Sequence, residues 1–383
     1  MEREQCDVAI VGAGPVGLLL ACLLSQRGVD VQVLEQREAL SSSSRAIGIH
    51  PPGLQCLREV GLADALIESG VRVRRGRVLC NGKTLGAVAF QTLAPPFDFV
   101  LSVPQTETER LLAARLRLLS AEALQRGVQV VGLDPQGSGW QLSLHEKSGQ
   151  RQLSARFVVG CDGKQSIVRR AMDVGYRGGP YRQSFVMGDF ADETGFGAEA
   201  AVYFTRDGLV ESFPLPGRYR RWVLGTRRQR VEPSAGTLAA LIERRTQQCV
   251  AADSARMLSG FTAEHYRAAS FVRRGLVLAG DAAHVLSPIG GQGMNLGWLD
   301  ARMLADTLKL SLHDETAAPR LLAEYASKRQ RAAALATRRA ELFMALGCAS
   351  GLLGLRAGLV RALLSRAVAP TAAQLFTMRG LVT

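Results

Sequence analysis

The first part of the chain places one longer apolar segment between two short β-branched runs. Residues 6–11 predict a buried strand, and residues 15–27 predict a helix that Gly28 ends. Residues 29–35 predict a second strand, and the loops between these elements are only a few residues long. The pattern therefore predicts a βαβ unit.

Further helices and strands follow along the chain. Leu and Ala at helical spacing over residues 106–126 predict a long helix that Gly127 stops. Residues 128–157 predict strands joined by turns near residues 135–139 and 147–149. The other expected helices cover residues 52–60, 237–250, 295–310 and 319–346, and two more strands cover residues 157–160 and 275–279.

Short strand-like runs dominate two segments that interrupt these α/β pieces. The simplest arrangement is an α/β protein in which a Rossmann-like nucleotide-binding domain is interleaved with an antiparallel-sheet domain. The expected boundaries are residues 1–71, 101–174 and 263–318 for the nucleotide domain, residues 72–100 and 175–262 for the substrate domain, and residues 319–383 for a C-terminal helical segment.

The composition is that of a globular protein, with 47% hydrophobic and 21% charged residues in a chain of 383. The net charge is +13, and 42 of the 47 basic residues are arginine. Residues 319–383 contain ten basic and two acidic residues and so carry +8 of this total. No aromatic residues are interleaved in a basic patch, so we expect no nucleic-acid binding and interpret the tail as a solvated helix face.

Two apolar runs bear on membrane association. Residues 8–24 are apolar, but glycines and Pro15 break them at the spacing of a nucleotide-binding turn, which argues against a signal peptide. Residues 342–355 carry no charge, and a spanning helix needs about 20 apolar residues. We therefore expect a buried helix there, with a peripheral membrane contact as the alternative.

The seven cysteines lie at positions 6, 22, 56, 80, 161, 249 and 348 and form no C-x-x-C pair. This pattern indicates buried thiols in a reducing, cytoplasmic compartment. The five histidines are widely spaced, so we expect no metal site. No oligomeric state follows from the sequence.

The turn after the first strand reads Gly-Ala-Gly-Pro-Val-Gly over residues 12–17. Gly12 permits a tight turn, Gly14 lets a pyrophosphate approach the backbone, and Gly17 lets the helix pack on the strand. Free N–H groups at the helix start face the negative charge. Glu35 ends the second strand, where a carboxylate binds ribose hydroxyls and repels a 2′-phosphate. The turn therefore predicts FAD or NAD rather than NADP at this site.

Two later strands end in Gly-Asp pairs. Residues 160–163 read Gly-Cys-Asp-Gly, and Gly280-Asp281 is followed by Pro-Ile-Gly-Gly-Gln-Gly-Met-Asn over residues 288–295. An aspartate at the carboxyl end of such a strand points into the ligand crevice. The alternatives are a simple turn for Asp162 and a helix N-cap for Asp281. Together the three clusters predict one extended cofactor, FAD, across a discontinuous domain.

With these motifs in this order, the chain resembles the single-component (group A) FAD-dependent aromatic hydroxylases, the para-hydroxybenzoate hydroxylase-like family. Cys161 departs from that family, which carries Ala there. The resemblance implies a FAD-binding domain of the GR2 type. It is carried by residues 12–17, 35, 44–46, 103–105, 109–112, 160–163, 169 and 280–295.

The resemblance also implies roles for individual residues. Arg45 would meet the pyrophosphate, Gln105 the ribityl or flavin region, and Asp281 the ribityl chain. Asp162 and Gly163 would also shape the transient approach of NAD(P)H. The implied cofactor-binding residues are Gly12, Gly14, Pro15, Val16, Gly17, Glu35, Gln36, Arg45, Gln105, Asp162, Gly163, Gly280, Asp281, Pro288, Gly291, Gly293, Met294 and Asn295.

The implied reaction uses NADH or NADPH to reduce FAD, after which O2 forms a flavin C4a-hydroperoxide that an electron-rich aromatic ring attacks. Pro288, Gly293 and Met294 would lie at the reaction zone, with the Pro288 carbonyl beside it. Backbone N–H groups at the start of the helix 295–310 could stabilise the anionic reduced flavin. We interpret His284 as a structural hydrogen-bond partner rather than a base.

Residues 210–215 are expected to form a strand over the flavin. The hydroxybenzoate enzyme places a carboxylate-binding arginine on the equivalent strand, whereas Phe213 and Pro214 stand here. We infer a larger, mostly apolar aromatic substrate of the polyketide or quinolone kind. Arg220 and Trp222 on the next strand are candidate lining residues, with the core as the alternative place for Trp222.

Three other functions stay open from the sequence. A related FAD-dependent epoxidase or reductase could act on an isoprenoid or lipid-like substrate, which the basic, apolar tail favours. A non-enzymatic flavoprotein would show no NAD(P)H turnover. A plain nicotinamide dehydrogenase would need a catalytic His or a Tyr–Lys pair after the first βαβ unit, and the sequence offers no convincing one.

Overall fold

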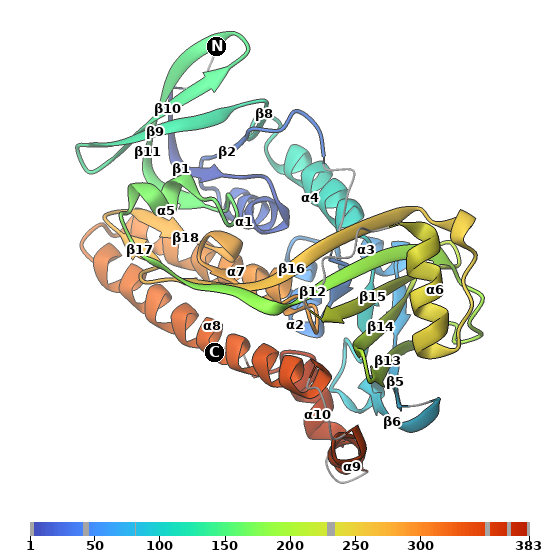
Figure 1. Ribbon diagram of the computed structural model, residues 1–383. Helices are drawn as coiled ribbons and strands as arrows, with labels where there is room; N and C mark the ends of the chain where they lie inside the picture. Colours follow the sequence, from blue (N-terminus) through green and yellow to red (C-terminus); the bar gives the residue numbers. More distant parts are fainter. Residues whose placement is uncertain are drawn as a thin grey trace.

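The computed structural model describes residues 4–40, 46–80, 82–227, 234–348, 353–365 and 369–380. These residues form an eight-stranded sheet with a parallel centre, an eight-stranded mostly antiparallel sheet and a small three-stranded sheet. Figure 1 shows the two large sheets at opposite ends of the molecule, joined by long strands and flanked by helices. The predicted fold class is confirmed.

The parallel sheet grows from β1 (Gln5–Val11), which pairs in parallel with β2 and β11. Residues 31–35 of β2 are all buried, as expected for strands covered on both faces. The strand order is β17 (Val272–Arg273), β18 (Leu276–Leu278), β11 (Gly149–Gly160), β1, β2 (Val31–Glu35) and β8 (Leu124–Arg126), with β10 (Gly139–Glu146) and β9 (Gln129–Gln136) extending β11 as a meander.

Helix α1 (Pro15–Gln26) is the central helix of the parallel-sheet domain. Residues 17–24 are buried on every side, because the helix is apolar around its whole circumference. It packs against α4 (Gln105–Leu119) on one flank and against α7 (Gln292–His313) on the other. The short helix α5 (Ile167–Ala171) lies against β9, β11 and β18.

The antiparallel sheet is reached through two long strands, β12 (Tyr176–Ala191) and β16 (Met257–Ala268), which extend from one large sheet to the other (Figure 1). Helix α6 (Ala235–Thr246) packs on one face of this sheet with Leu238 and Ile242. The strand order is β19 (His284–Val285), β16, β12, β15 (Tyr219–Arg227), β14 (Gly208–Leu215), β13 (Ala200–Thr205), β5 (Arg75–Cys80) and β6 (Lys83–Ala89).

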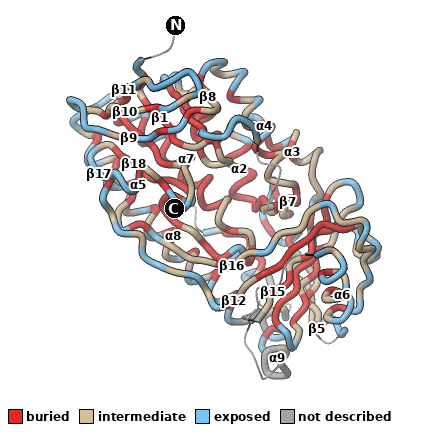
Figure 2. The backbone as a smooth tube through the Cα atoms, turned by 45° about the horizontal axis from the view of Figure 1, so that its top comes forward, coloured by how far each residue is buried: buried red, intermediate tan, exposed pale blue. Residues whose placement is uncertain are grey.

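A small sheet and two helices lie between these layers. The sheet consists of β3 (Gly48–Ile49), β7 (Val100–Ser102) and β4 (Val71–Val73). Helix α2 (Pro51–Glu59) packs on α7, and α3 (Ala63–Ser69) follows it. Figure 2 shows buried segments in the parallel sheet, in α7 and along β15.

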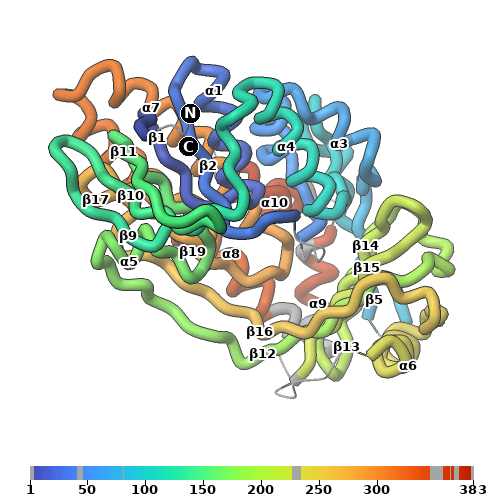
Figure 3. Tube along the Cα trace, turned by 90° about the horizontal axis from the view of Figure 1, so that it is seen from above, coloured from blue at the N-terminus to red at the C-terminus, as the bar shows by residue number. Residues whose placement is uncertain are grey.

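The C-terminal helices connect both domains. Helix α8 (Ala318–Cys348) packs along α7, whereas α9 (Leu353–Leu363) and α10 (Ala369–Phe376) lie beside β6 (Figures 1 and 3). The tail therefore begins on the parallel-sheet domain and ends against the antiparallel sheet.

Several local predictions are corrected by the structure. The helix predicted over residues 106–126 ends at Leu119, because residues 124–126 pair with β2 as an edge strand. Helix α3 was not predicted. The apolar run at residues 342–355 is not one buried helix, since Leu342 is 56% exposed and the described part of the run divides between α8 and α9. No helix among the described residues is long and apolar enough to cross a membrane.

The predicted domain boundaries stay a prediction. Three of them fall inside strands, namely β4, β7 and β16.

The cysteines are buried at positions 6, 22, 56 and 80, as predicted, but Cys161 is half-buried and Cys249 is exposed. The side chain of Cys348 lies outside the described residues. Among the described residues, no group of three His, Cys, Asp or Glu is placed to hold a metal ion.

A buried charge cluster joins α7 to α8 and β19. Asp300 is fully buried, and its Oδ1 accepts a hydrogen bond from Arg329 Nε at 2.6 Å. Its Oδ2 lies 2.5 Å from His284 Nε2 and accepts the Gly280 N–H at 3.1 Å. Desolvation opposes ionisation, but the neighbouring His284 and Arg329 hold the pKa of Asp300 below its ordinary value.

We predict that Asp300→Ala lowers the free energy of unfolding by about 3–5 kcal/mol, because the buried Arg329 keeps its charge but loses the carboxylate that balances it. Urea titration of the FAD-free protein checks this. The control is Asp306→Ala, whose 64%-exposed carboxylate pairs with Arg27 at 2.7 Å and whose loss should cost less than about 1 kcal/mol. Equal effects of the two substitutions would contradict the prediction.

Candidate functional site

A cavity of about 1650 Å³ lies between the two large sheets. Its walls come from the β1–α1 turn, the end of β2, the start of α4, the β11–α5 loop, the loop before α7 and one face of the antiparallel sheet. Typical ligand pockets measure about 300–1,000 Å³. The cavity therefore has room for a large cofactor together with a second molecule.

The surroundings of the glycine-rich turn explain why glycine stands at positions 12, 14 and 17. A Cβ at Gly12 would stand 2.5 Å from Cys161 O, and a Cβ at Gly17 would stand 2.1 Å from Gly12 O. Both positions are therefore fixed by packing within the protein. Gly14 differs, because a Cβ there would meet nothing within 4 Å, and Gly14 lines the cavity. The turn thus leaves open a space that the protein itself does not fill.

Helix α1 begins at this turn without a side-chain cap. Its first-turn N–H groups are therefore available to an anion, which the helix dipole also favours. Pro15 and Val16 line the cavity beside them. The arrangement fits the pyrophosphate of a dinucleotide.

Glu35 and Gln36 line the cavity at the end of β2. Glu35 Oε2 accepts the Ala13 N–H at 2.9 Å, and Oε1 accepts hydrogen bonds from Arg37 at 2.9 Å. Although desolvation acts to raise it, these hydrogen bonds hold the pKa of Glu35 below its ordinary value. Glu35 is therefore an ionised acceptor next to the glycine turn, as ribose binding requires.

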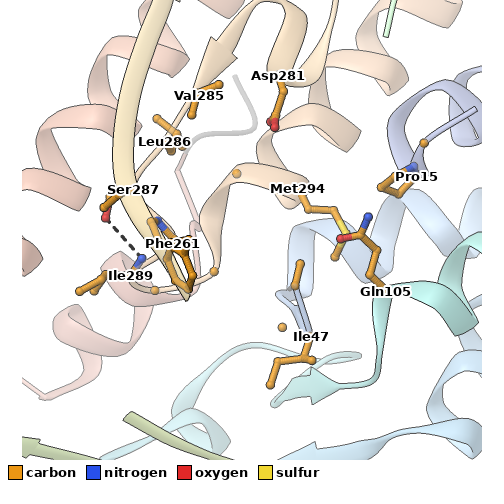
Figure 4. A pocket seen from close by; sticks show the side chains of 18 of the residues that line it. Pro15, Ile47, Gln105, Phe261, Asp281, Val285, Leu286, Ser287, Ile289 and Met294 are labelled. Carbon is orange, nitrogen blue, oxygen red and sulfur yellow. Dashed lines mark hydrogen bonds between the residues drawn. The ribbon is translucent and has the colours of Figure 1, made fainter. Parts of the chain in front are cut away.

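The two aspartates behave differently. Asp162 Oδ2 accepts the Ile167 N–H at 2.7 Å at the start of α5. This hydrogen bond supports the alternative of a local structural role for Asp162. Asp162 and Gly163 nevertheless both line the cavity. The Asp281 carboxyl points into the cavity (Figure 4). Desolvation raises the pKa of Asp281 above its ordinary value. Arg169 ties the two loops together by donating to Ala282 O and Lys164 O.

The loop before α7 carries the predicted reaction zone. Pro288, Gly291, Gly293 and Met294 line the cavity, as does Gln105 of α4 (Figure 4). The Pro288 carbonyl accepts the Gly291 N–H at 3.0 Å, so the turn itself already uses one of its lone pairs. Helix α7 has no side-chain cap at Gly291, which leaves its first N–H groups available to the cavity.

Three predicted cofactor-binding residues do not line the cavity, namely Gly17, Gly280 and Asn295. Asn295 is fully buried, and its side chain bonds the backbone of Gly48, His50 and Gly291. The direct contact predicted for these residues therefore stays a prediction, and in the structure Gly17 and Asn295 fix the shape of the loops around the cavity. The predicted Arg45 lies outside the described residues.

His50 lines the cavity, and its place there was missed by sequence analysis. Its Nε2 lies 2.8 Å from Gly290 O, and its ring meets the edge of Phe376. Burial lowers the pKa of His50 to about 4, so the ring is neutral near pH 7. No motif around His50 marks it, because the contact joins positions 240 residues apart. His284, in contrast, does not line the cavity and bonds Asp300, as the structural interpretation predicted.

The antiparallel sheet corrects the predicted substrate residues. Phe213 lines the cavity as predicted, but Pro214, Arg220 and Trp222 do not, so their prediction as lining residues is wrong. Trp222 packs in the core under α6, and Arg220 pairs with Asp192 at 3.0 Å. Alternate residues of a strand face opposite sides of a sheet, and the prediction fell on the wrong side.

Their neighbours, which sequence analysis missed, face the cavity instead. Glu211, Arg221 and Val223 line it together with Phe213. Arg221 donates to both carboxylate oxygens of Asp189, at 2.6 and 2.7 Å. The alternation of side chains along β14 and β15 could have revealed these residues once one residue of each strand was oriented.

Comparison with known proteins decides the family. The model of the FAD binding domain family matches residues 5–340. The chain belongs to this FAD-binding family. The predicted resemblance to the group A flavin hydroxylases and the FAD cofactor are confirmed.

Curated relatives of this family member are monooxygenases. A 12-dehydrotetracycline 5-monooxygenase/anhydrotetracycline 6-monooxygenase of Streptomyces rimosus is 32% identical over 342 residues, covering 86% of this chain and 67% of that protein. A rifampicin monooxygenase of Streptomyces venezuelae is 34% identical over 308 residues, covering 77% of this chain and 62% of that protein. The chain spans between 56% and 67% of the length of the first three curated relatives.

Solved structures share the same fold. The crystal structure of p-nitrophenol 4-monooxygenase from Pseudomonas putida matches with a TM-score of 0.90 over 99% of each chain, at 24% sequence identity. The described residues also fit FAD, since the open space at Gly14, the uncapped start of α1 and the ionised Glu35 together provide a dinucleotide cradle.

We predict that Gly14→Val weakens FAD binding by at least about tenfold, because the new side chain fills cradle space without touching the protein. Flavin content and FAD titration of the purified apoprotein measure this, while urea titration should show little change in its stability. Gly17→Ala is the matched contrast: its Cβ clashes with Gly12 O, so it should destabilise the apoprotein itself. Unaltered FAD affinity in Gly14→Val would contradict the assignment.

Proposed function

We propose that this protein is a FAD-dependent monooxygenase that uses NAD(P)H and O2 to hydroxylate a largely apolar aromatic substrate of the polyketide kind. The observation that carries the proposal is the continuity of the cavity, which runs from the dinucleotide cradle at Gly14 to an apolar sheet wall at Phe213 and Val223. The names of the tetracycline and rifampicin relatives support a multi-ring substrate.

When bound, FAD supplies the redox chemistry, taking a hydride from NAD(P)H and delivering one oxygen atom from O2. The protein's own residues bind and orient. The start of α1 with Gly12 and Gly14 would hold the pyrophosphate, Glu35 a ribose, and Asp281 a ribityl hydroxyl. The N–H groups of Gly293 and Met294 at the start of α7 would stabilise negative charge on the ring system.

The substrate half of the cavity would exclude water. Apolar residues of six strands face it, and aromatic residues of the C-terminal helices close it from another side. Such a lining protects a reactive oxygen species from decay in water. These wall residues are Val78, Met187, Val202, Phe213, Val223 and Phe261 from the sheet, with Phe343 and Phe376 from α8 and α10.

The proposal predicts a yellow protein whose NAD(P)H oxidation and O2 uptake rise severalfold in the presence of a suitable aromatic compound. Oxygen consumption with NADH and NADPH across phenols, quinolones and multi-ring aromatics measures this. A hydroxylated product should appear in step with the NAD(P)H consumed above background.

Two results would count against the proposal. Turnover that proceeds equally well without oxygen would indicate a reductase acting on an isoprenoid or lipid-like substrate. A FAD-loaded protein whose oxygen uptake no member of the panel raises would contradict hydroxylation of this substrate class.

A further inference from the structure

The substrate half of the cavity contains an acidic side chain, Glu211, to which the described residues offer no partner. Glu211 lies in the middle of β14, directly opposite Val202 of β13 and Val223 of β15. The next residues of β14 on the same face are Leu209 and Phe213, which also line the cavity. Glu211 is 7% exposed. A carboxyl group therefore stands between apolar side chains at the nearest positions of its own strand and of both neighbouring strands.

No hydrogen bond or ion pair from the described residues reaches the Glu211 carboxyl. The neighbouring cations are already engaged: Arg221 is held by both oxygens of Asp189, and Arg77, which also lines the cavity, is held by Glu199. A lone buried carboxyl is costly to a fold, so its retention indicates a partner that arrives with a ligand.

No charged group among the described residues is a cause of the pKa shift of Glu211, and one cation close to β14 is bonded to backbone. Arg245 of α6 donates to the backbone oxygens of Leu209 and Gly225. Desolvation is the cause that raises the pKa of Glu211, to about 7. The group therefore changes charge within the working range of most enzymes.

Resting on the proposed function, we propose that Glu211 is the residue that selects and orients the substrate, by accepting a hydrogen bond from a phenolic hydroxyl on the ring that enters the apolar half of the cavity. The same carboxylate disfavours a substrate with its own carboxylate at this end. The cations that could offset that repulsion, Arg221 and Arg77, are already paired.

The chemistry of the substrate class follows from this placement. A neutral aromatic ring would be buried against the apolar wall residues, and its hydroxyl would donate a hydrogen bond to Glu211. The hydrogen bond also draws electron density toward the ring, which favours attack on an electrophilic oxygen. Hydroxyarenes are therefore the expected substrates, whereas arenecarboxylates and ethers of the same size are not.

The test uses FAD-loaded protein and three ligands of one ring system: 2-naphthol, 2-methoxynaphthalene and 2-naphthoate. Binding is measured by the change in the flavin absorption spectrum on titration. We expect the wild type to bind 2-naphthol about tenfold or more tightly than the methyl ether, and 2-naphthoate most weakly. In Glu211→Gln the preference over the ether should shrink and 2-naphthoate should bind more tightly.

A pH series separates a charge effect from a change of shape. In the wild type, affinity for 2-naphthol should rise about tenfold from pH 6 to pH 8 as Glu211 ionises, because the ionised form is the stronger acceptor. A phenolic hydroxyl ionises near pH 10, outside this window. Glu211→Gln should show a flat profile. The matched control is Glu243→Gln, an exposed residue of α6, which should keep the wild-type order and profile.

The outcomes distinguish this inference from the proposed function. If Glu211→Gln keeps the wild-type ligand order and pH profile, or if the wild type binds none of the three ligands, the role of Glu211 is overturned. If the ligand order changes as expected but no ligand raises oxygen uptake, the role in binding stands and the proposed hydroxylation fails.

Discussion

The site depends on polar side chains of α7 that are buried within the protein and bonded to backbone groups of distant loops. Trp298 Nε1 donates to Pro15 O at 3.0 Å, Asn295 bonds the backbone at Gly48 and His50, and Asp300 accepts the Gly280 N–H. A buried polar group without a partner is costly, so each loop is held where these side chains need it. One helix thereby fixes three loops that surround the cofactor cavity.

Small residues let these parts approach closely enough for those bonds to form. A Cβ at Gly53 of α2 would stand 2.3 Å from Asn295 Oδ1, and one at Gly297 of α7 would stand 2.5 Å from Val16. The cofactor half of the cavity is thus built from backbone and helix ends. The substrate half is built from side chains of a sheet and of C-terminal helices, which leaves it free to vary in shape and chemistry. If the cofactor half of such a cavity is kept and the substrate half is changed, the same reaction can be carried out on different aromatic compounds.

Local sequence patterns predicted the structure correctly where an element is formed by residues that are close together in the sequence. The strand, glycine turn and helix of residues 5–26 and the meander of residues 129–160 lie where the sequence predicted them. The predictions failed where a distant partner decided the outcome. Residues 124–126 left the predicted helix to pair with β2.

By itself, the sequence determined the βαβ unit, the cofactor class and the interleaving of two kinds of sheet. These follow from periodicity and from glycines whose positive φ or close contacts admit no side chain, as at Gly12. Only the tertiary structure decided which side of β14 and β15 faces the cavity, and so that Glu211 rather than Arg220 or Trp222 lies there. A strand's two faces are equivalent in sequence until packing against other elements buries one of them in the core and opens the other onto a ligand.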